Sequence, residues 1–312
     1  MSEERLGSAL SKLPAEVCSR TRVFTKVGRL VRGDVVVNDF TGEGARASLL
    51  ESLSRLGLAA VHSLRIHDPN DSPERPPEVD EVGVALGPGG MVEALVAMRT
   101  SGTISQVSLR MNSNVERGPG REFALPPSLT AGRPAEIERL VAAAPAGTFD
   151  DALLAGGWTL LTQAALPAMV ACQQRGVPVA VAGIFATGLL TDCPKVSPQV
   201  GKVTYAYQAA SEELVARASR WRELAAEHQL SLSAVAIAFA YLPTVVHRVV
   251  IGCATAHEVS ANIEAVRLSA SVPPSLWHQA RARGLLGPEV PLPVDMRIVK
   301  IKCGVSRVVQ YK

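Results

Sequence analysis

Two basic side chains, Lys26 and His67, stand where short β-rich segments end, and their types suit proton transfer at a small molecule. His67 closes the segment 60–66, and Asp68-Pro69 then begins a loop, because proline has no amide to continue a ladder. A histidine at the carboxyl end of a strand lies where barrel enzymes place catalytic groups. The alternative is a histidine that only satisfies a strand end, and this stretch alone does not separate the two.

Lys26 is the one charged residue of the apolar run Val23–Val27. A buried lysine without a partner is costly, so the pattern favours a functional role over a structural one. Three other histidines favour packing or surface positions, and no His/Glu spacing indicates a metal site: these are His62, His228 and His278.

Strand-like and helix-like segments alternate along the chain, which predicts an α/β fold with a parallel sheet. The predicted strands are 22–27, 60–66, 103–110, 151–156, 177–183 and 248–252. The predicted helices are 2–13, 43–56, 89–101, 134–143, 164–174, 211–228, 232–242, 255–266 and 274–283. Among the strands, 177–183 is almost continuously apolar, as a strand buried on both faces must be.

The strand count falls short of a closed (β/α)8 barrel, which needs eight strands and about 250 residues. No G-x-G-x-x-G turn follows any predicted strand, so a Rossmann dinucleotide fingerprint is absent. We expect the segment 29–42 to be a loop. The segments 71–88 and 113–133 are longer than ordinary βα connections, and we interpret them as inserted surface loops.

Composition narrows the class of protein. The 312 residues are 47% hydrophobic and 20% charged, with a net charge of +3, which gives no support to nucleic-acid binding. Five widely spaced cysteines without a C-x-x-C pair suit a reduced chain and argue against a zinc site or disulfide framework. The apolar runs are too short to span a bilayer, and the N-terminus lacks a signal region, so we expect a cytoplasmic protein that does not bind membranes.

Several separated segments resemble the aldo-keto reductase family, and most closely its aldose 1-dehydrogenase branch, with a pyridoxal 4-dehydrogenase nearby. These segments are FTKVGRL at 24–30, IHDP at 66–69, LLAGGWTLL at 153–161, AGIFATGLL at 182–190, and 250–252 running on to Glu258 and Asn262. The resemblance implies one (β/α)8 TIM barrel domain over residues 1–293, with inserted loops at about 71–88 and 113–133. The tail 294–312 lies outside it.

The same resemblance implies an NAD(P)-dependent oxidoreductase that oxidises L-fucose, D-arabinose or a related D-threo-aldose at C1 to the lactone. The family works with an Asp, Tyr, Lys and His tetrad, in which the lysine lowers the tyrosine pKa. Lys26 matches the lysine and His67 the histidine. The family's aspartate and tyrosine, and its first two strands, would precede Met1, so we expect a chain truncated at its N-terminus.

The missing pair leaves an alternative open: a non-catalytic truncated chain or pseudoenzyme that acts as a binding module. Tyr205 and Tyr207 follow a predicted strand, but they lie too far along the chain to be favoured as substitutes for the family's tyrosine. The resemblance implies that the small-molecule partner is a sugar. The preferred sugar and the oligomeric state stay open.

Cofactor contacts are expected at Asn112 and Trp158 and along two later segments. The candidates are Asn112, Trp158, Gly183, Ile184, Gly188, Leu189, Gly252, Thr255, Glu258 and Asn262. The glycines permit close backbone approach, and the helix beginning near Thr255 offers free amides to an anion. Trp158 could stack on a cofactor ring or fill the core. Asn112 is expected to bind the cofactor carboxamide, but its alignment with the family leaves Met111 or Ser113 as alternatives.

The cofactor is predicted to be NAD rather than NADP. No Lys or Arg occurs between Gly252 and Arg267 to bind a 2′-phosphate, and Glu258 would repel one. Arg248 or a residue of an inserted loop keeps NADP open as the alternative.

Overall fold

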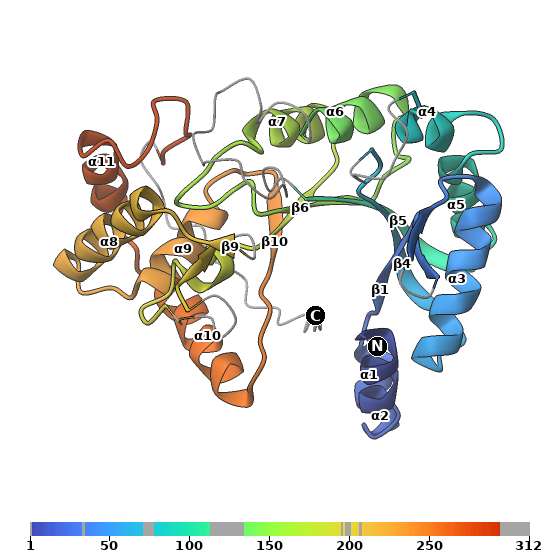
Figure 1. Ribbon diagram of the computed structural model, residues 1–312, viewed down its shortest axis with the longest axis horizontal. Helices are drawn as coiled ribbons and strands as arrows, with labels where there is room; N and C mark the ends of the chain where they lie inside the picture. Colours follow the sequence, from blue (N-terminus) through green and yellow to red (C-terminus); the bar gives the residue numbers. More distant parts are fainter. Residues whose placement is uncertain are drawn as a thin grey trace.

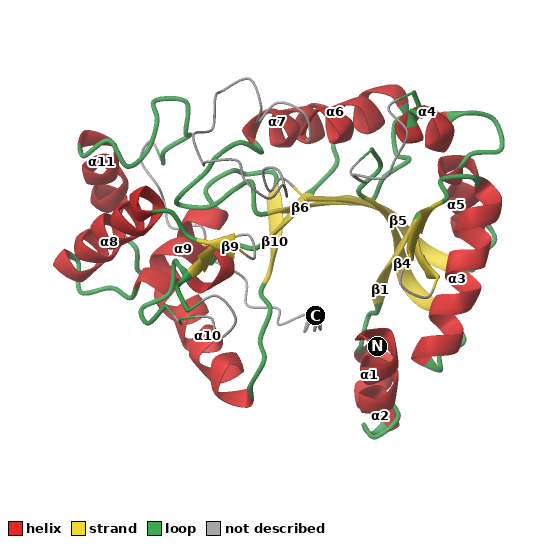
Figure 2. Cartoon of the chain, viewed as in Figure 1, coloured by secondary structure: helices red, strands yellow, loops and turns green. Residues whose placement is uncertain are grey.

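The computed structural model describes residues 2–32, 35–70, 78–112, 134–194, 196, 201–205 and 208–293 (Figures 1 and 2). Its helices are α1 (Ser2–Leu10), α2 (Ala15–Arg20), α3 (Gly42–Leu56), α4 (Glu81–Leu86), α5 (Met91–Thr100), α6 (Pro134–Ala143), α7 (Leu166–Gln174), the 3₁₀ turn η1 (Ala186–Gly188), α8 (Glu212–Glu227), α9 (Leu232–Ala240), α10 (Ala256–Ser269) and α11 (Pro274–Ala282). Its strands are β1 (Phe24–Val27), β2 (Arg29–Arg32), β3 (Val35–Asn38), β4 (Val61–His67), β5 (Ile104–Asn112), β6 (Asp151–Ala155), β7 (Val179–Ala182), β8 (Thr204–Tyr205), β9 (Gln208–Ala209) and β10 (Val246–Val250).

One six-stranded sheet organises the described part of the chain. Its order is β1-β4-β5-β6-β7-β10, and every neighbouring pair is parallel. The predicted parallel α/β fold is therefore confirmed, with each of the six predicted strands present. Figure 1 shows the sheet bent into an arch, with helices along its outer side and an open side between α1 and α10.

The two faces of the arch differ in chemistry because successive strand residues point to opposite faces. The outer face is apolar and packs under the helices through Val27, Leu64, Ile66, Val107, Leu109, Leu154 and Val181, all in the main hydrophobic core. The inner, concave face carries two kinds of residue. Polar and charged side chains occupy it mainly on β1, β4 and β5, with Asp151 and Arg248 added from β6 and β10: Lys26, Arg65, His67, Ser108, Arg110, Asp151 and Arg248. A small apolar cluster occupies it towards the carboxyl ends of β6, β7 and β10: Leu153, Ala155, Ala180 and Val250.

Helix α3 shows how local signals set the frame for β1. Thr41 begins the helix by accepting a hydrogen bond from the Gly44 amide at 3.1 Å, and Gly57 ends it in the left-handed region at φ 63°. The helix packs against both β1 and α5, which fixes the edge of the sheet that carries Lys26.

Two expectations about loops were wrong. The segment 29–42 contains the antiparallel hairpin β2–β3. The glycine and aspartate between its two short strands made the whole segment resemble a loop in the sequence. The segment 71–88 was expected to be an inserted loop, but it contains α4, with Val82 and Ala85 fully buried. Residues 71–77, the expected loop 113–133 and the tail 294–312 lie outside the described residues. No described helix is long and apolar enough to cross a membrane.

Candidate active site

The two predicted catalytic residues lie on the concave face, towards the carboxyl ends of neighbouring strands. Lys26 in β1 pairs in register with Arg65 of β4, and His67 is the last residue of β4, opposite Arg110 of β5. Parallel strands end at one edge of a sheet, so the pairing brings these side chains together. The fold therefore places Lys26 and His67 where a small molecule at the carboxyl edge could meet both.

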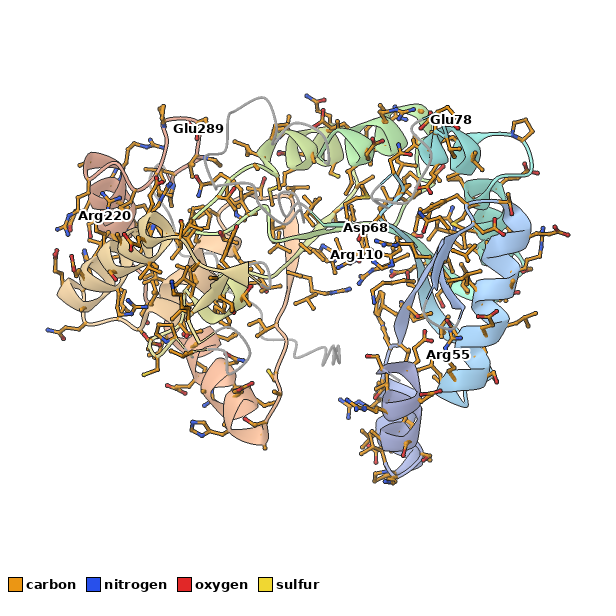
Figure 3. The ribbon with its side chains drawn as sticks, in the orientation of Figure 1. Arg55, Asp68, Glu78, Arg110, Arg220 and Glu289 are labelled. Carbon is orange, nitrogen blue, oxygen red and sulfur yellow. The ribbon has the colours of Figure 1, made fainter. Side chains whose placement is uncertain are left out.

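Asp68 holds His67 in place, and sequence reasoning missed this carboxylate. It is 1% exposed, has φ 47°, and its Oδ2 lies 3.2 Å from His67 Nε2. Arg110 Nη1 donates a 2.7 Å hydrogen bond to the same Asp68 oxygen and also contacts His67 Nε2 (Figure 3). A second cation, Arg29 Nη1, lies 3.8 Å from that oxygen. The available signal was a carboxylate directly after a histidine at a strand end.

Burial shifts both candidate catalytic groups towards their neutral forms. The pKa of Lys26 is lowered first by burial and then by the nearby Arg110 and Arg65 charges, against the opposing carboxylates Glu3 and Asp68. Burial also lowers the pKa of His67 to about 4, although its hydrogen bond with Asp68 acts in the opposite direction. His67 is thus a neutral imidazole at neutral pH, and the Lys26 amine loses its proton more readily than an exposed lysine.

The neutral state of His67 predicts acid sensitivity. Because its folded-state pKa of about 4 lies below the ordinary 6.5, the unfolded chain binds more protons between those values. The free energy of unfolding should therefore fall as the pH drops from 6.5, by on the order of 1–3 kcal/mol near pH 4. Urea unfolding from pH 4 to 8 measures this, and His67→Gln should flatten the slope.

Part of the slope should remain in His67→Gln, because burial also lowers the pKa of His62 and His247. The exposed substitution His257→Gln serves as the control and should keep the wild-type profile. An unchanged slope in His67→Gln would show that His67 carries its charge in the folded protein.

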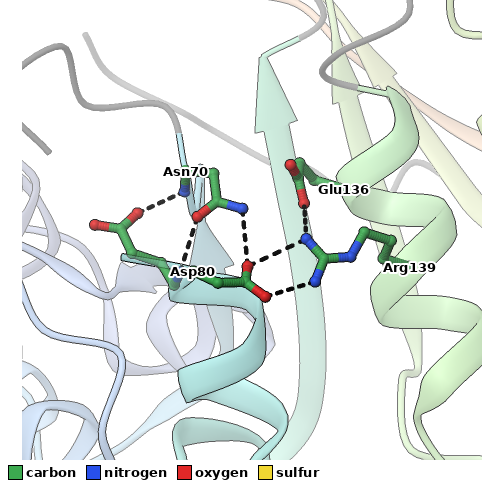
Figure 4. Close-up of polar contacts among 5 residues, drawn as sticks. Asn70, Asp80, Glu136 and Arg139 are labelled. Carbon is green, nitrogen blue, oxygen red and sulfur yellow. Dashed lines mark hydrogen bonds and ion pairs between the residues drawn. The ribbon is translucent and has the colours of Figure 1, made fainter. Parts of the chain in front are cut away.

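A polar clamp beside this site ties the exit of β4 to α4 and α6 (Figure 4). Asn70, with φ 63°, accepts from the Glu81 amide at 2.8 Å, and its own amide donates to the Glu81 carboxylate. Arg139 binds Asp80 through both terminal nitrogens at 3.1 and 2.7 Å, and this holds the pKa of Asp80 well below its usual range. The clamp fixes the turn that follows His67.

Deeper on the concave face, one buried carboxylate serves two arginines. Arg65 Nη2 donates to Asp151 Oδ2 at 3.0 Å, and Arg248 Nη1 lies 3.6 Å from the same oxygen. The Phe24 ring lies under both guanidinium carbons, at 4.6 Å from that of Arg65 and 5.3 Å from that of Arg248. Since Phe24 is in β1 and Arg248 in β10, this contact spans the two end strands of the arch.

The cluster is electrostatically incomplete. Desolvating each buried ion costs several kcal/mol, whereas a cation–π contact returns only about 0.5–2 kcal/mol. The Arg65 and Asp151 side chains are 5% and 3% exposed, and that of Arg248 is 23% exposed. One carboxylate and one ring therefore leave the positive charge of the two arginines partly uncompensated.

The expected cofactor segments meet at the carboxyl edge between β7 and β10. These strands pair directly, with Ala182 opposite Val250, so Gly183–Leu189 and Gly252–Asn262 leave the sheet side by side. Gly183 has φ 70°, and a Cβ there would lie 3.2 Å from the Gly156 amide nitrogen, so the position requires glycine. Gly188, with φ 93°, ends the η1 turn.

The start of α10 is a capped helix terminus. Thr255 accepts from the Glu258 amide at 3.2 Å, while the Glu258 carboxylate accepts from the Ala254 amide at 2.7 Å. Asn262 Nδ2 donates to Cys253 Sγ at 3.2 Å, which ties the first turns of the helix to the loop after β10. The carboxylate of Glu258 therefore lies at the helix N-terminus, where an anionic ligand would otherwise be attracted.

Comparison with known proteins finds similarity to one enzyme family. Residues 135–274, which contain β6, β7, β10 and α10, match the aldo/keto reductase family model. The chain is also 29% identical over 306 residues to a D-threo-aldose 1-dehydrogenase of Pseudomonas sp, with 91% of this chain and 80% of the relative covered.

A second relative and two solved structures are similar to this chain over most of its length. A pyridoxal 4-dehydrogenase of Microbacterium luteolum is 25% identical over 313 residues, covering 91% of this chain and 80% of the relative. The holo aldo-keto reductase structure from Bacillus halodurans superposes with a TM-score of 0.58 at 18% identity, covering 93% and 78% of the two chains. A glycerol dehydrogenase from Gluconobacter oxydans gives 0.58 at 16% identity, covering 94% and 79%.

The solved structures share the α/β fold of this chain, with parallel strands and helices along one side of the sheet. Both sequence relatives are dehydrogenases.

Several predicted residues have surroundings that bear on their roles. Trp158 is 1% exposed, stacks on Phe239 at 4.9 Å between ring centroids, and donates to the Phe239 carbonyl, so it fills the core, and a cofactor contact stays a prediction. Ile184 and Leu189 are buried in the same core. Asn112 ends β5 at the carboxyl edge, while Ser113 lies outside the described residues.

Of the two alternative tyrosines, the structure describes only Tyr205, and it lies away from the site. Tyr205 lies in the β8–β9 hairpin, where burial raises the pKa of its hydroxyl, and Figure 1 shows that hairpin on the far side of the arch from β1. Tyr207 lies outside the described residues. Within the part of the chain that the structure describes, no cluster of three His, Cys, Asp or Glu side chains could hold a metal ion.

Proposed function

We propose that the chain is an NAD-dependent aldose 1-dehydrogenase that oxidises L-fucose, D-arabinose or a related D-threo-aldose at C1 to the lactone. The observation that carries the proposal is the placement of Lys26 and His67 together on the concave face, both shifted towards their neutral forms. The D-threo-aldose 1-dehydrogenase relative supports the substrate class.

In this proposal Lys26 is the base. The reaction removes a proton from the C1 hydroxyl and a hydride from C1, and a base with a pKa near the working pH does this best. Burial and neighbouring cations lower the pKa of Lys26 from its ordinary value, which is the direction that a lysine base requires. In its unprotonated form the amine would accept the hydroxyl proton. When NAD is bound, its nicotinamide would accept the hydride from C1.

His67 orients the reacting oxygen in this mechanism. Its imidazole is held by Asp68 and Arg110, so the ring cannot swing away when a sugar hydroxyl approaches. Asp68 and Arg110 are therefore positioning residues. Gly183, Gly188, Gly252 and Thr255 are proposed to receive the cofactor diphosphate at the edge shared by β7 and β10, with Asn112, Trp158, Ile184, Leu189, Glu258 and Asn262 around the rest of the cofactor.

The activity is tested by incubating the protein with NAD and L-fucose or D-arabinose while following NADH absorbance and lactone formation. The proposal predicts one NADH for each lactone formed, with a rate that rises with pH as Lys26 loses its proton. NADH formation that is absent with both sugars, although NAD binds, would contradict an aldose dehydrogenase.

A second function is favoured by one observation. Within the described residues, the charged groups that shift the pKa of Lys26 are Arg110, Glu3, Arg65 and Asp68, and the described Tyr205 lies in the separate β8–β9 hairpin. A chain that binds NAD and sugar without turnover would fit that arrangement as well. Saturable sugar binding with no hydride transfer, measured by quenching of tryptophan fluorescence, would select this function.

Cofactor preference gives a separate prediction. The Glu258 carboxylate at the start of α10 should repel a 2′-phosphate, so NAD should bind at least about tenfold more tightly than NADP. Glu258→Gln removes the charge and keeps an acceptor for the Ala254 amide, so it should raise NADP affinity and leave NAD affinity nearly unchanged. Titration of both proteins with both cofactors measures the two ratios. Tighter NADP than NAD binding by the wild-type protein would overturn this assignment.

A further inference from the structure

The cluster around Asp151 contains more basic groups than one carboxylate can satisfy. Lys26, Arg65 and Asp151 occupy neighbouring positions across β1, β4 and β6 on the concave face, and Arg248 reaches the same carboxylate from β10. Glu3 approaches Lys26 from α1, but its two oxygens already accept hydrogen bonds from Thr25 and Arg55.

Three polar atoms of this cluster are buried and have no hydrogen-bond partner in the described structure: Arg65 Nε, Arg248 Nη1 and Asp151 Oδ1. Buried donors and acceptors are satisfied in the great majority of native structures. The two arginine nitrogens are cationic donors, which an oxyanion would satisfy. The Asp151 oxygen is an acceptor, which a hydroxyl would satisfy.

A phosphate group meets both requirements, because its anionic oxygens accept from guanidinium groups while a P–OH, or a hydroxyl of the sugar that carries it, donates to a carboxylate. We propose that Arg65, Arg248 and Asp151 form a phosphate-binding site on the concave face, beside Lys26. Its ligand is the phosphate group of a phosphorylated aldose. The assignment of an aldose rests on the proposed function, whereas the phosphate site does not.

The position of the site suits such a substrate. Lys26 belongs both to this cluster and to the candidate catalytic pair, so a sugar whose phosphate lies against Arg65 and Arg248 keeps its other end near Lys26 and His67. Arg248 lies on the end strand β10, and its side chain is 23% exposed, compared with 5% for Arg65 and 3% for Asp151. The ligand is therefore expected to enter past Arg248.

Inorganic phosphate tests the site without any catalysis. Phosphate at constant ionic strength should raise the unfolding temperature of the wild-type protein relative to chloride, and Arg248→Gln should abolish most of that rise. Arg248→Lys keeps the charge and should retain part of it. Arg267→Gln removes a 71% exposed arginine from α10 and should keep the full rise. No rise in the wild type, or an equal rise in Arg248→Gln, would overturn the site.

Sugar oxidation distinguishes free phosphate from a phosphate carried by the substrate. The wild-type kcat/KM should be higher for D-arabinose 5-phosphate than for D-arabinose, and Arg248→Gln should reduce this preference at least about tenfold, the loss expected for one charge-assisted contact. A phosphate-dependent temperature rise without oxidation of either sugar would contradict the dehydrogenase and uphold the site. Oxidation of both sugars at equal kcat/KM would contradict the site's ligand and uphold the dehydrogenase.

Discussion

Lys26→Met is expected to lower kcat for aldose oxidation by about 10²–10⁴-fold, the usual contribution of a positioned acid or base. Methionine keeps the length and apolar stem of the side chain but cannot accept a proton, so the β1 strand should remain in place. Stopped-flow measurement of NADH formation at saturating sugar reports kcat directly. Cofactor affinity should change little, because the diphosphate contacts are expected from residues that follow β7 and β10 and not from Lys26.

The matched control for this prediction is Lys12→Met, which alters an exposed lysine beyond the end of α1 and should leave kcat unchanged. A Lys26→Met protein with wild-type kcat would show that Lys26 is structural. Loss of NAD binding together with kcat would instead place the lysine at the cofactor.

Asp151→Ala should lower the free energy of unfolding by about 3–5 kcal/mol, because it leaves the Arg65 charge buried without its carboxylate. This is the largest stability effect expected from any single polar substitution in the sheet. Chemical unfolding in urea measures it, and an unchanged m-value would show that the loss belongs to the folded state.

Two comparisons sharpen the stability prediction. Glu264→Ala breaks an exposed pair with Arg267 and should cost no more than about 1 kcal/mol. The double variant Arg65→Met with Asp151→Leu removes both charges and should be more stable than Asp151→Ala alone. An Asp151→Ala protein as stable as the wild type would mean that Arg65 finds another partner or reaches water.

The main sheet could be predicted from sequence because its strands read as short apolar runs between helices with clear stops. The valine- and leucine-rich runs identified β4 to β7, and the glycine at 57 marked the end of α3. Lys26 and His67 were likewise visible, since each is a polar group where an apolar strand ends. Local sequence patterns are sufficient for features of this kind.

The polar network could not be predicted, because its partners are distant in the chain. Arg65 and Asp151 are 86 residues apart, and their contact depends on the register of β4, β5 and β6. His67 and Arg110 meet only because the same register places them opposite each other. Helix α4 was missed for a different reason: proline and charge in the preceding segment made the whole stretch resemble a loop.

The proton acceptor is the central claim, and Lys26→Arg tests it most directly through initial rates of NADH formation with L-fucose and NAD. Arginine keeps a positive charge at this position but cannot act as a base, because its pKa stays far above the working pH. The account predicts that Lys26→Arg is as slow as Lys26→Met, although it binds NAD normally. A Lys26→Arg protein that turns over L-fucose at the wild-type rate would contradict it, because then only the charge of Lys26 would matter.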